Sequence, residues 1–66
     1  MQDELLNTTE VAAWIKRPVG TLWQWRVRGV GPRGFRVEGG QVLYRRTEVE
    51  RWLAAQEAAD KVAVAG

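Results

Sequence analysis

Apolar residues recur at the spacing of one helical face near the start of the chain, at Val11, Trp14 and Ile15. Asn7 and Glu10 stand three residues apart just before this run, which is the spacing of a helix capping box. A proline follows at position 18, and the residue before a proline disfavours helical backbone. We therefore predict a first helix that begins after Asn7 and ends by residue 17.

A second helix is predicted for residues 19–28. Pro18 suits the beginning of a helix because it has no N–H to leave unpaired, and Gly29 suits the left-handed position that ends one. Leu22 and Trp25 lie on one side of this segment, which we expect to be the buried side. Two short helices joined by a tight turn form a helix-turn-helix arrangement.

Two β-prone runs follow, at residues 35–37 and 42–45, and the residues between them include Gly39 and Gly40. Such a pattern indicates a β-hairpin. The alternation along the strands predicts which side chains face the core: Phe35, Val37, Val42 and Tyr44 inward, and Arg36, Leu43 and Arg45 outward.

Thr47 and Glu50 have the spacing of a second capping box, so we predict a third helix that begins there. Its apolar face carries Val49, Trp52 and Leu53. The third helix completes the order helix, helix, hairpin, helix.

This order predicts a single domain at residues 1–56, mostly α with a small β-hairpin, of the winged helix-turn-helix class. Large apolar residues give way to alanine after this point. We therefore expect residues 57–66 to form a tail that is a frayed helix or disordered.

The composition limits how so small a domain is held together. The 66 residues include no cysteine and no histidine, and the eight acidic residues show no metal-loop spacing, so we expect neither a disulfide, nor a metal, nor a cofactor. We expect the four tryptophans to serve as core anchors instead. No His, Cys or paired-carboxylate constellation is present to supply a base, a nucleophile or a metal site, so we expect no enzymatic activity.

The start of the chain is acidic and polar, which is unlike a secretory signal. No apolar run approaches the roughly 20 residues that span a bilayer. We therefore expect a cytoplasmic protein with no membrane partner.

Charge is unevenly distributed along the chain. Residues 16–46 hold eight basic residues and one acidic residue, whereas the rest of the chain holds two basic and seven acidic residues. A positive field over the middle of the chain favours a polyanion such as double-stranded DNA, although a solvated basic surface gives the same count. Eight of the ten basic residues are arginines, which suit bidentate contacts to phosphate and guanine.

The side of the second helix opposite Leu22 and Trp25 is the candidate for the major groove of DNA. Gln24 is the base-reading candidate because its amide pairs bidentately with adenine, and Val27 suits a thymine methyl; both also fit a plain exposed surface. Trp23 either packs on the hairpin or lies against the sugar-phosphate backbone. The helix residues that we expect at DNA are Gly20, Thr21, Trp23, Gln24, Val27 and Arg28.

Contacts to the DNA backbone are expected around this helix. Gly20 lets the helix approach DNA closely, and the Thr21 hydroxyl lies near the helix start, where a phosphate binds. Arginines flank the hairpin on both sides and suit phosphate or minor-groove contacts, as do the basic residues of the turn. The residues that we expect at the backbone are Lys16, Arg17, Arg26, Arg33, Arg36, Arg45 and Arg46.

Three stretches carry a recognisable pattern: Pro18–Arg26 (PVGTLWQWR), Gly29–Pro32 (GVGP) and Tyr44–Leu53 (YRRTEVERWL). Together they resemble the excisionase family of recombination directionality factors, which carry a MerR-like winged helix-turn-helix. The likeness covers about residues 5–54 and is greatest to the small excisionases of actinobacterial phages.

The resemblance implies that the second helix enters the major groove and that the hairpin is the wing. Gly20, Gln24 and Val27 match the positions at which such proteins place major-groove residues. Excisionases bind tandem sites head to tail, bend DNA and direct a phage integrase towards excision, but they do not cut DNA themselves. The wing tip at Glu38 departs from members that have a basic residue there.

MerR regulators carry a long dimerisation helix, whereas the residues after Leu53 lack a sustained heptad. We therefore expect a monomer in solution, with neighbouring copies and a phage integrase as partners on DNA. A small MerR-like transcriptional regulator would use the same DNA surface, and an adjacent integrase gene would favour the excisionase. A protein-interaction module is a third hypothesis, and it predicts little affinity for duplex DNA.

Overall fold

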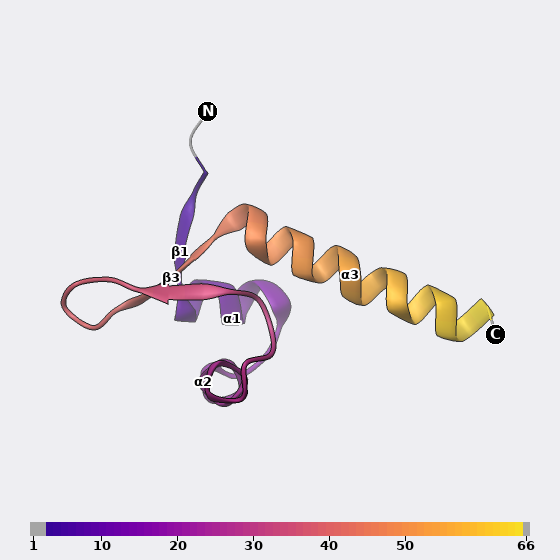
Figure 1. Cartoon of the computed structure of the whole chain (residues 1–66), viewed down its shortest axis with the longest axis horizontal. Coiled ribbons are helices and arrows are strands. Elements are labelled where there is room, and N and C mark those ends of the chain that lie inside the picture. The colour runs from indigo at the N-terminus through magenta and orange to yellow at the C-terminus, as the bar shows by residue number, and fades with distance from the viewer. Residues whose placement is uncertain (1–2, 66) are drawn as a thin grey trace.

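Within residues 3–65, which the computed structural model describes, the chain forms three helices and a three-stranded antiparallel sheet (Figure 1). The elements are β1 (Leu5–Asn7), α1 (Thr8–Ile15), α2 (Val19–Arg28), β2 (Gly34–Arg36), β3 (Val42–Arg45) and α3 (Arg46–Ala65). The predicted fold class, mostly helical with a small hairpin, is confirmed, and the arrangement is consistent with a winged helix-turn-helix. Side chains are described for residues 3–60.

The first helix begins as the sequence predicts. The Asn7 side chain accepts the N–H of Glu10, and the Glu10 carboxylate accepts the N–H of Asn7, both at 2.8 Å. The helix ends at Lys16, whose φ of 61° is left-handed, and the N–H of Arg17 donates to the carbonyl of Ala12 at 3.0 Å. This left-handed residue turns the chain sharply, so that α2 begins only three residues after α1 ends.

The second helix also has the predicted ends. Pro18 caps its beginning and Gly29, with a φ of 76°, caps its end in the left-handed conformation. The loop that follows folds back onto Trp25. A Cβ added to Gly31 would lie 2.7 Å from the Trp25 ring, so only glycine allows this close approach.

The sheet contains a strand that the sequence analysis did not predict. β3 lies in the centre, and β1 and β2 pair with it on its two sides. β1 has only three residues, too few to show the alternation by which a strand is recognised. β1 adds a third strand to the hairpin by pairing with β3, and it connects the start of the chain to the start of α3.

The predicted facing of the first hairpin strand is wrong. Phe35 pairs with Leu43, and Arg36 pairs with Val42. Directly paired residues share a face, so Phe35 lies outward beside Leu43 and is 38% exposed, while Arg36 lies on the same face as Val42. The predicted facing of β3 is confirmed. A difference of one residue in register moves every side chain of a strand to the other face, and the register here is set by the loop at residues 37–41, which pairs Arg36 with Val42.

The core lies between the inner face of the sheet, α1, α2 and the beginning of α3. Its buried apolar residues are Leu6, Val11, Ala12, Leu22, Val42, Tyr44 and Val49. The tryptophans, predicted as core anchors, lie at its margin instead: Trp14, Trp25 and Trp52 are half-buried, and Trp23 is 41% exposed. The Trp25 and Trp52 rings contact each other at a tilt of 47°, with centroids 5.3 Å apart, and join α2 to α3.

The predicted capping box of the third helix is wrong. α3 begins one residue earlier, at Arg46, and a distant residue caps it: the Asp3 carboxylate accepts the N–H of Thr47 at 3.2 Å and its hydroxyl at 2.6 Å. The Thr47 hydroxyl is therefore a donor to Asp3, whereas a capping box requires it to accept from Glu50. Glu50 instead accepts from Arg46 at 3.2 Å.

α3 extends away from the rest of the molecule (Figure 1). It continues to Ala65, so the boundary predicted at residue 56 does not coincide with a helix end. The expected fraying of the tail at residues 57–66 stays a prediction, and residue 66 lies outside the described residues.

Candidate nucleic-acid interface

One side of α2 packs on nothing within the described residues. Leu22, on the buried side, is 2% exposed, whereas Val27 on the opposite side is 88% exposed. Gln24 and Arg28 are also exposed there. A helix that places valine and glutamine in solvent presents a surface of the width and chemistry that the major groove of DNA accepts.

Gly20 lies near the beginning of this exposed side. A Cβ added at this position would meet no atom within 4 Å, so the packing of the chain does not require glycine here. Glycine within a helix costs about 0.5–1 kcal/mol relative to alanine. Gly20 therefore brings no packing benefit inside the molecule.

Trp23 faces a groove between α2, the beginning of α1 and the return strand of the hairpin. The sequence analysis did not predict that Thr9 and Gln41 would lie beside it. Both are exposed, and both line the same groove as Trp23. They come from segments 32 residues apart in the sequence, so only the fold brings them together. Thr21 is half-buried, in the first turn of α2.

Arg26 joins α2 to the hairpin. Its guanidinium donates to the carbonyl of Gly34 at 3.3 Å, and its positive charge lies near the Tyr44 phenol. Burial raises the pKa of Tyr44 above its usual value, against the opposing effects of Arg26 and a hydrogen bond with Thr8. A Cβ on Gly34 would lie 2.8 Å from the ring of Tyr44, its pairing partner on β3, so glycine lets this ring pack closely against β2.

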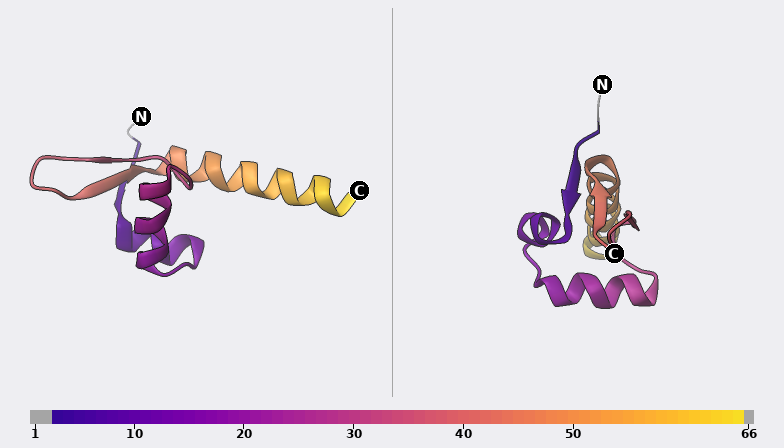
Figure 2. Two further views of the ribbon diagram at one scale, coloured as in Figure 1. Left: turned by 60° about the horizontal axis from the view of Figure 1, so that its bottom comes forward. Right: turned by 90° about the vertical axis from the view of Figure 1, so that its left-hand side faces the viewer.

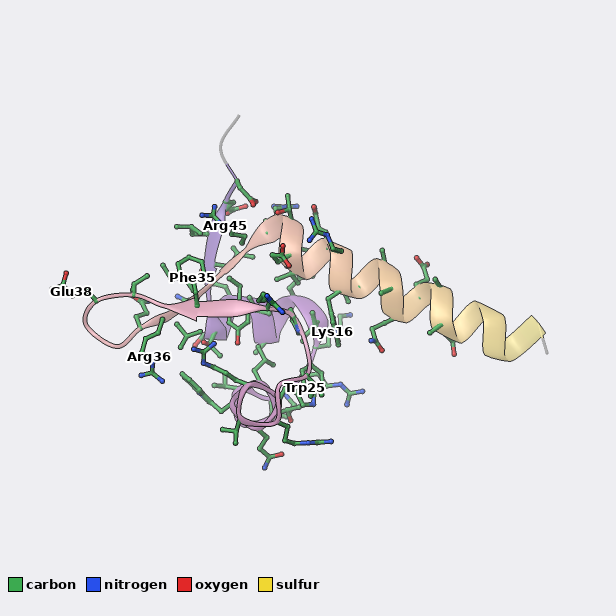
Figure 3. The ribbon with its side chains drawn as sticks, in the orientation of Figure 1. Lys16, Trp25, Phe35, Arg36, Glu38 and Arg45 are labelled. Atoms are coloured by element: carbon green, nitrogen blue, oxygen red, sulfur yellow. The ribbon has the colours of Figure 1, made fainter. Side chains whose placement is uncertain are left out.

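The arginines of the hairpin do not share one surface. Arg36 points to the side on which α2 lies, whereas Arg45 lies on the far side of the hairpin, over the Phe35 ring at 5.7 Å (Figure 3). Glu38 stands at the tip of the hairpin (Figure 3). Arg36 and α2 can therefore contact one DNA molecule together, and Arg45 faces away from them.

Arg46 lies at the surface with its side chain 53% exposed, but it pairs with acidic residues of the chain itself. Its guanidinium pairs with Glu4 at 2.9 Å and with Glu50 at 3.2 Å, and it lies 5.4 Å from the centre of the Trp14 ring. Hydrogen bonds to Glu4 and Glu50 raise the pKa of Arg46. The structure thus separates Arg45 and Arg46 from the basic residues that were predicted with them.

The remaining predicted residues lie in the two connecting segments. Lys16 and Arg17 are exposed in the turn between α1 and α2, and Arg33 is exposed in the loop before β2. Among the described side chains, none of these three takes part in an ion pair. The turn leads into α2, the loop that holds Arg33 follows it, and the hairpin projects beyond it (Figure 2).

Comparison with known families identifies the domain. The family model described as the helix-turn-helix domain matches residues 5–57, which is most of the chain. The chain belongs to the helix-turn-helix domain family. Comparison with curated proteins gave no match.

In this helix-turn-helix domain the turn Lys16–Pro18 lies between the two helices of the motif, α1 and α2. A helix-turn-helix domain suggests DNA as the partner, with α2 in the position of the second, groove-entering helix. The family description names the domain and no role in excision.

Within the described residues no group of three or more His, Cys, Asp or Glu is placed to hold a metal ion. No helix in the part of the chain that the structure describes is long and apolar enough to cross a membrane.

Proposed function

We propose that the protein binds double-stranded DNA sequence-specifically and acts as a phage excisionase in the host cytoplasm. It binds tandem sites cooperatively, bends the DNA and directs a phage integrase towards excision. The protein performs no catalytic step itself in this proposal. Gln24, Val27 and Gly20 meet the bases in the major groove, and Arg36 contacts the backbone from the wing.

The observation that carries the proposal is the exposed side of α2. Val27 is 88% exposed and Gly20 leaves open space, so neither residue serves the core. Apolar and amide groups on an unpacked helix suit thymine methyls and adenine edges. The exposed basic residues of the turn and of the hairpin lie next to this side and suit phosphates.

Cooperative binding along DNA is supported by two surfaces away from α2. The outer face of the sheet exposes Leu5 at 47% and Phe35 at 38%, with the Arg45 cation above Phe35. α3 carries an apolar strip around Leu53, flanked by Glu50 and Glu57. The two surfaces are both apolar and opposite in charge, which suits a head-to-tail contact between neighbouring copies.

Selection of sites from random duplex DNA with the purified protein, followed by footprinting at increasing concentrations, tests the proposal. We expect closely spaced direct repeats that are occupied together. Inverted half-sites would instead indicate a dimeric transcriptional regulator. No enrichment and no protection would overturn DNA binding and leave the interaction module.

The excision role has its own test. The protein is added to a purified phage integrase and to duplexes that carry the two product sites of integration for that integrase. We expect recombination to excision products only when the protein is present. Specific binding without any effect on the direction of recombination would overturn the excisionase role and keep the DNA-binding role.

A further inference from the structure

A groove separates α2 from the wing, and it is formed by three elements that are distant in the sequence. One wall comes from the beginning of α1, one from Trp23 on α2, and one from the start of β3 with the residues before it. The residues that line it are Asn7, Thr8, Thr9, Trp23, Gly40, Gln41 and Val42.

The groove has free polar groups that the fold does not use. None of the side-chain hydrogen bonds among the described residues involves the Thr9 hydroxyl or the Gln41 amide. The Asn7 side chain is occupied, because it caps Glu10. Neither an acidic nor a basic residue lines the groove, so its chemistry is neutral hydroxyl and amide groups beside one indole.

The position of the groove between α2 and the wing indicates which part of a DNA duplex would lie against it. If α2 lies in the major groove and the wing lies at the neighbouring minor groove, one sugar-phosphate strand separates those two grooves. That strand has to cross the protein between α2 and the wing, which is where Thr9, Trp23 and Gln41 meet.

We propose that this groove binds the sugar-phosphate strand between the two DNA grooves. The inference rests on the proposed DNA-binding function. The Thr9 hydroxyl and the Gln41 amide donate to one phosphate, and the exposed edge of Trp23 packs against the adjoining sugar. Donors without charge hold the strand only at close range, so this site fixes the position of α2 on the duplex, while the arginines supply long-range attraction.

The test uses the full chain and a duplex that carries its selected site. Each backbone position in turn is replaced by an uncharged methylphosphonate. For the wild-type protein, we expect the affinity to fall when the replaced phosphate is the one that Thr9 and Gln41 bind. A hydrogen bond to a charged group corresponds to at least about tenfold in affinity, so Thr9→Val is expected to bind the unmodified duplex at least about tenfold more weakly. Because Gln41 still donates to the same phosphate, the variant is expected to lose less affinity than wild type, but not none, when that phosphate is replaced.

Gln41→Glu places a carboxylate in the groove, and we expect it to weaken binding at least tenfold, because the carboxylate repels the phosphate. The matched control is Gln56→Glu on α3, which makes the same change of net charge at an exposed position outside the groove. We expect the affinity of the control for DNA to stay within about twofold of wild type, because salt screens a charge at an exposed position outside the groove. Unchanged melting temperatures verify that both variants fold.

The outcomes separate the two levels of the inference. If wild-type protein binds the duplex and Thr9→Val binds equally well, or if Gln41→Glu and Gln56→Glu weaken binding equally, the groove does not hold the strand. If the wild-type protein itself shows no affinity for duplex DNA, the proposed function fails and this site fails with it.

Discussion

Single residues of α2 and of the loop after it differ in whether the fold needs them. Leu22 is almost completely buried, and Gly31 allows the loop to close over Trp25. Gly20 and Val27 contribute nothing comparable, because one leaves open space and the other lies in solvent. Residues that weaken or do not help the folded state mark the surface on which a partner acts.

Gln24→Ala tests base reading. The variant is expected to fold normally, since Gln24 is exposed, and to lose roughly 1–3 kcal/mol of discrimination at one base pair. Competition binding with duplexes altered at each position measures the preference. Unchanged affinity and unchanged preference at every position would show that α2 does not read bases through this residue.

Gly20→Ala tests the close approach of the helix. Alanine removes the backbone flexibility of glycine and meets no atom within 4 Å, so we expect the free energy of unfolding to rise by about 0.5–1 kcal/mol. The added methyl group is expected to weaken DNA binding, because it holds the helix away from the duplex. Denaturant unfolding and a binding titration measure the two effects, and a variant that is stabilised and binds DNA as tightly as wild type would contradict the assignment.

At the scale of the elements, the start of the chain holds the start of α3. Asp3 caps the first turn of α3 through Thr47, and Glu4 pairs with Arg46. β1 between them pairs with β3, which leads directly into α3. These contacts fix the base of a helix whose far end extends away from the core.

Asp3→Asn tests this capping through its pH dependence. Hydrogen bonding with Thr47 lowers the pKa of Asp3, so the stabilisation is present above the pKa of the unfolded chain and is lost as pH falls through the folded value. We expect the variant to melt at a lower temperature than wild type near pH 7. The difference is expected to shrink as pH falls below about 4, the ordinary pKa of aspartate. A difference that stays constant with pH would exclude a role for the charged carboxylate.

The sequence predicted the elements whose signals are local. α1 and α2 have the expected ends because their caps lie within a few residues of each other, as Asn7 and Glu10 do. The signals that were missed are distant: β1 forms only by pairing with β3, and α3 is capped by Asp3, 44 residues away from Thr47. A plausible local alternative at Thr47 and Glu50 therefore gave a wrong prediction.

The sequence predicted the exposed side of α2, but not which residues of other elements lie beside it. Helical periodicity separates the exposed side of α2 from Leu22 without any tertiary information. The periodicity does not place Thr9 and Gln41 beside Trp23, because that contact depends on the register of the hairpin. The periodicity also does not show that Arg36 and Arg45 lie on opposite faces of the hairpin, because this depends on which face of the sheet each strand residue occupies.

At the scale of the whole molecule, the basic residues divide by direction. Arg36 lies toward α2, whereas Arg46 is neutralised by Glu4 and Glu50. Fewer arginines than the sequence contains are therefore available to attract DNA. The electrostatic attraction to DNA phosphates depends on the arginines that reach the duplex.

The salt dependence of binding distinguishes these arginines. We expect Arg36→Ala to weaken binding to all sequences and to reduce the slope of log K against log salt by about one, since one phosphate contact is lost. Arg46→Ala makes the same change of charge and is expected to leave the slope nearly unchanged. Equal slopes for the two variants would contradict the division.

The most direct test of the central claim is the affinity of the wild-type protein for its selected site and for a shuffled duplex of the same length, measured at the same salt concentration. A sequence-specific helix-turn-helix protein is predicted to prefer the selected site by about a thousandfold or more, and Gln24→Ala is predicted to reduce that ratio. Equal affinity for the two duplexes would contradict sequence-specific binding and reduce the basic surface to nonspecific attraction.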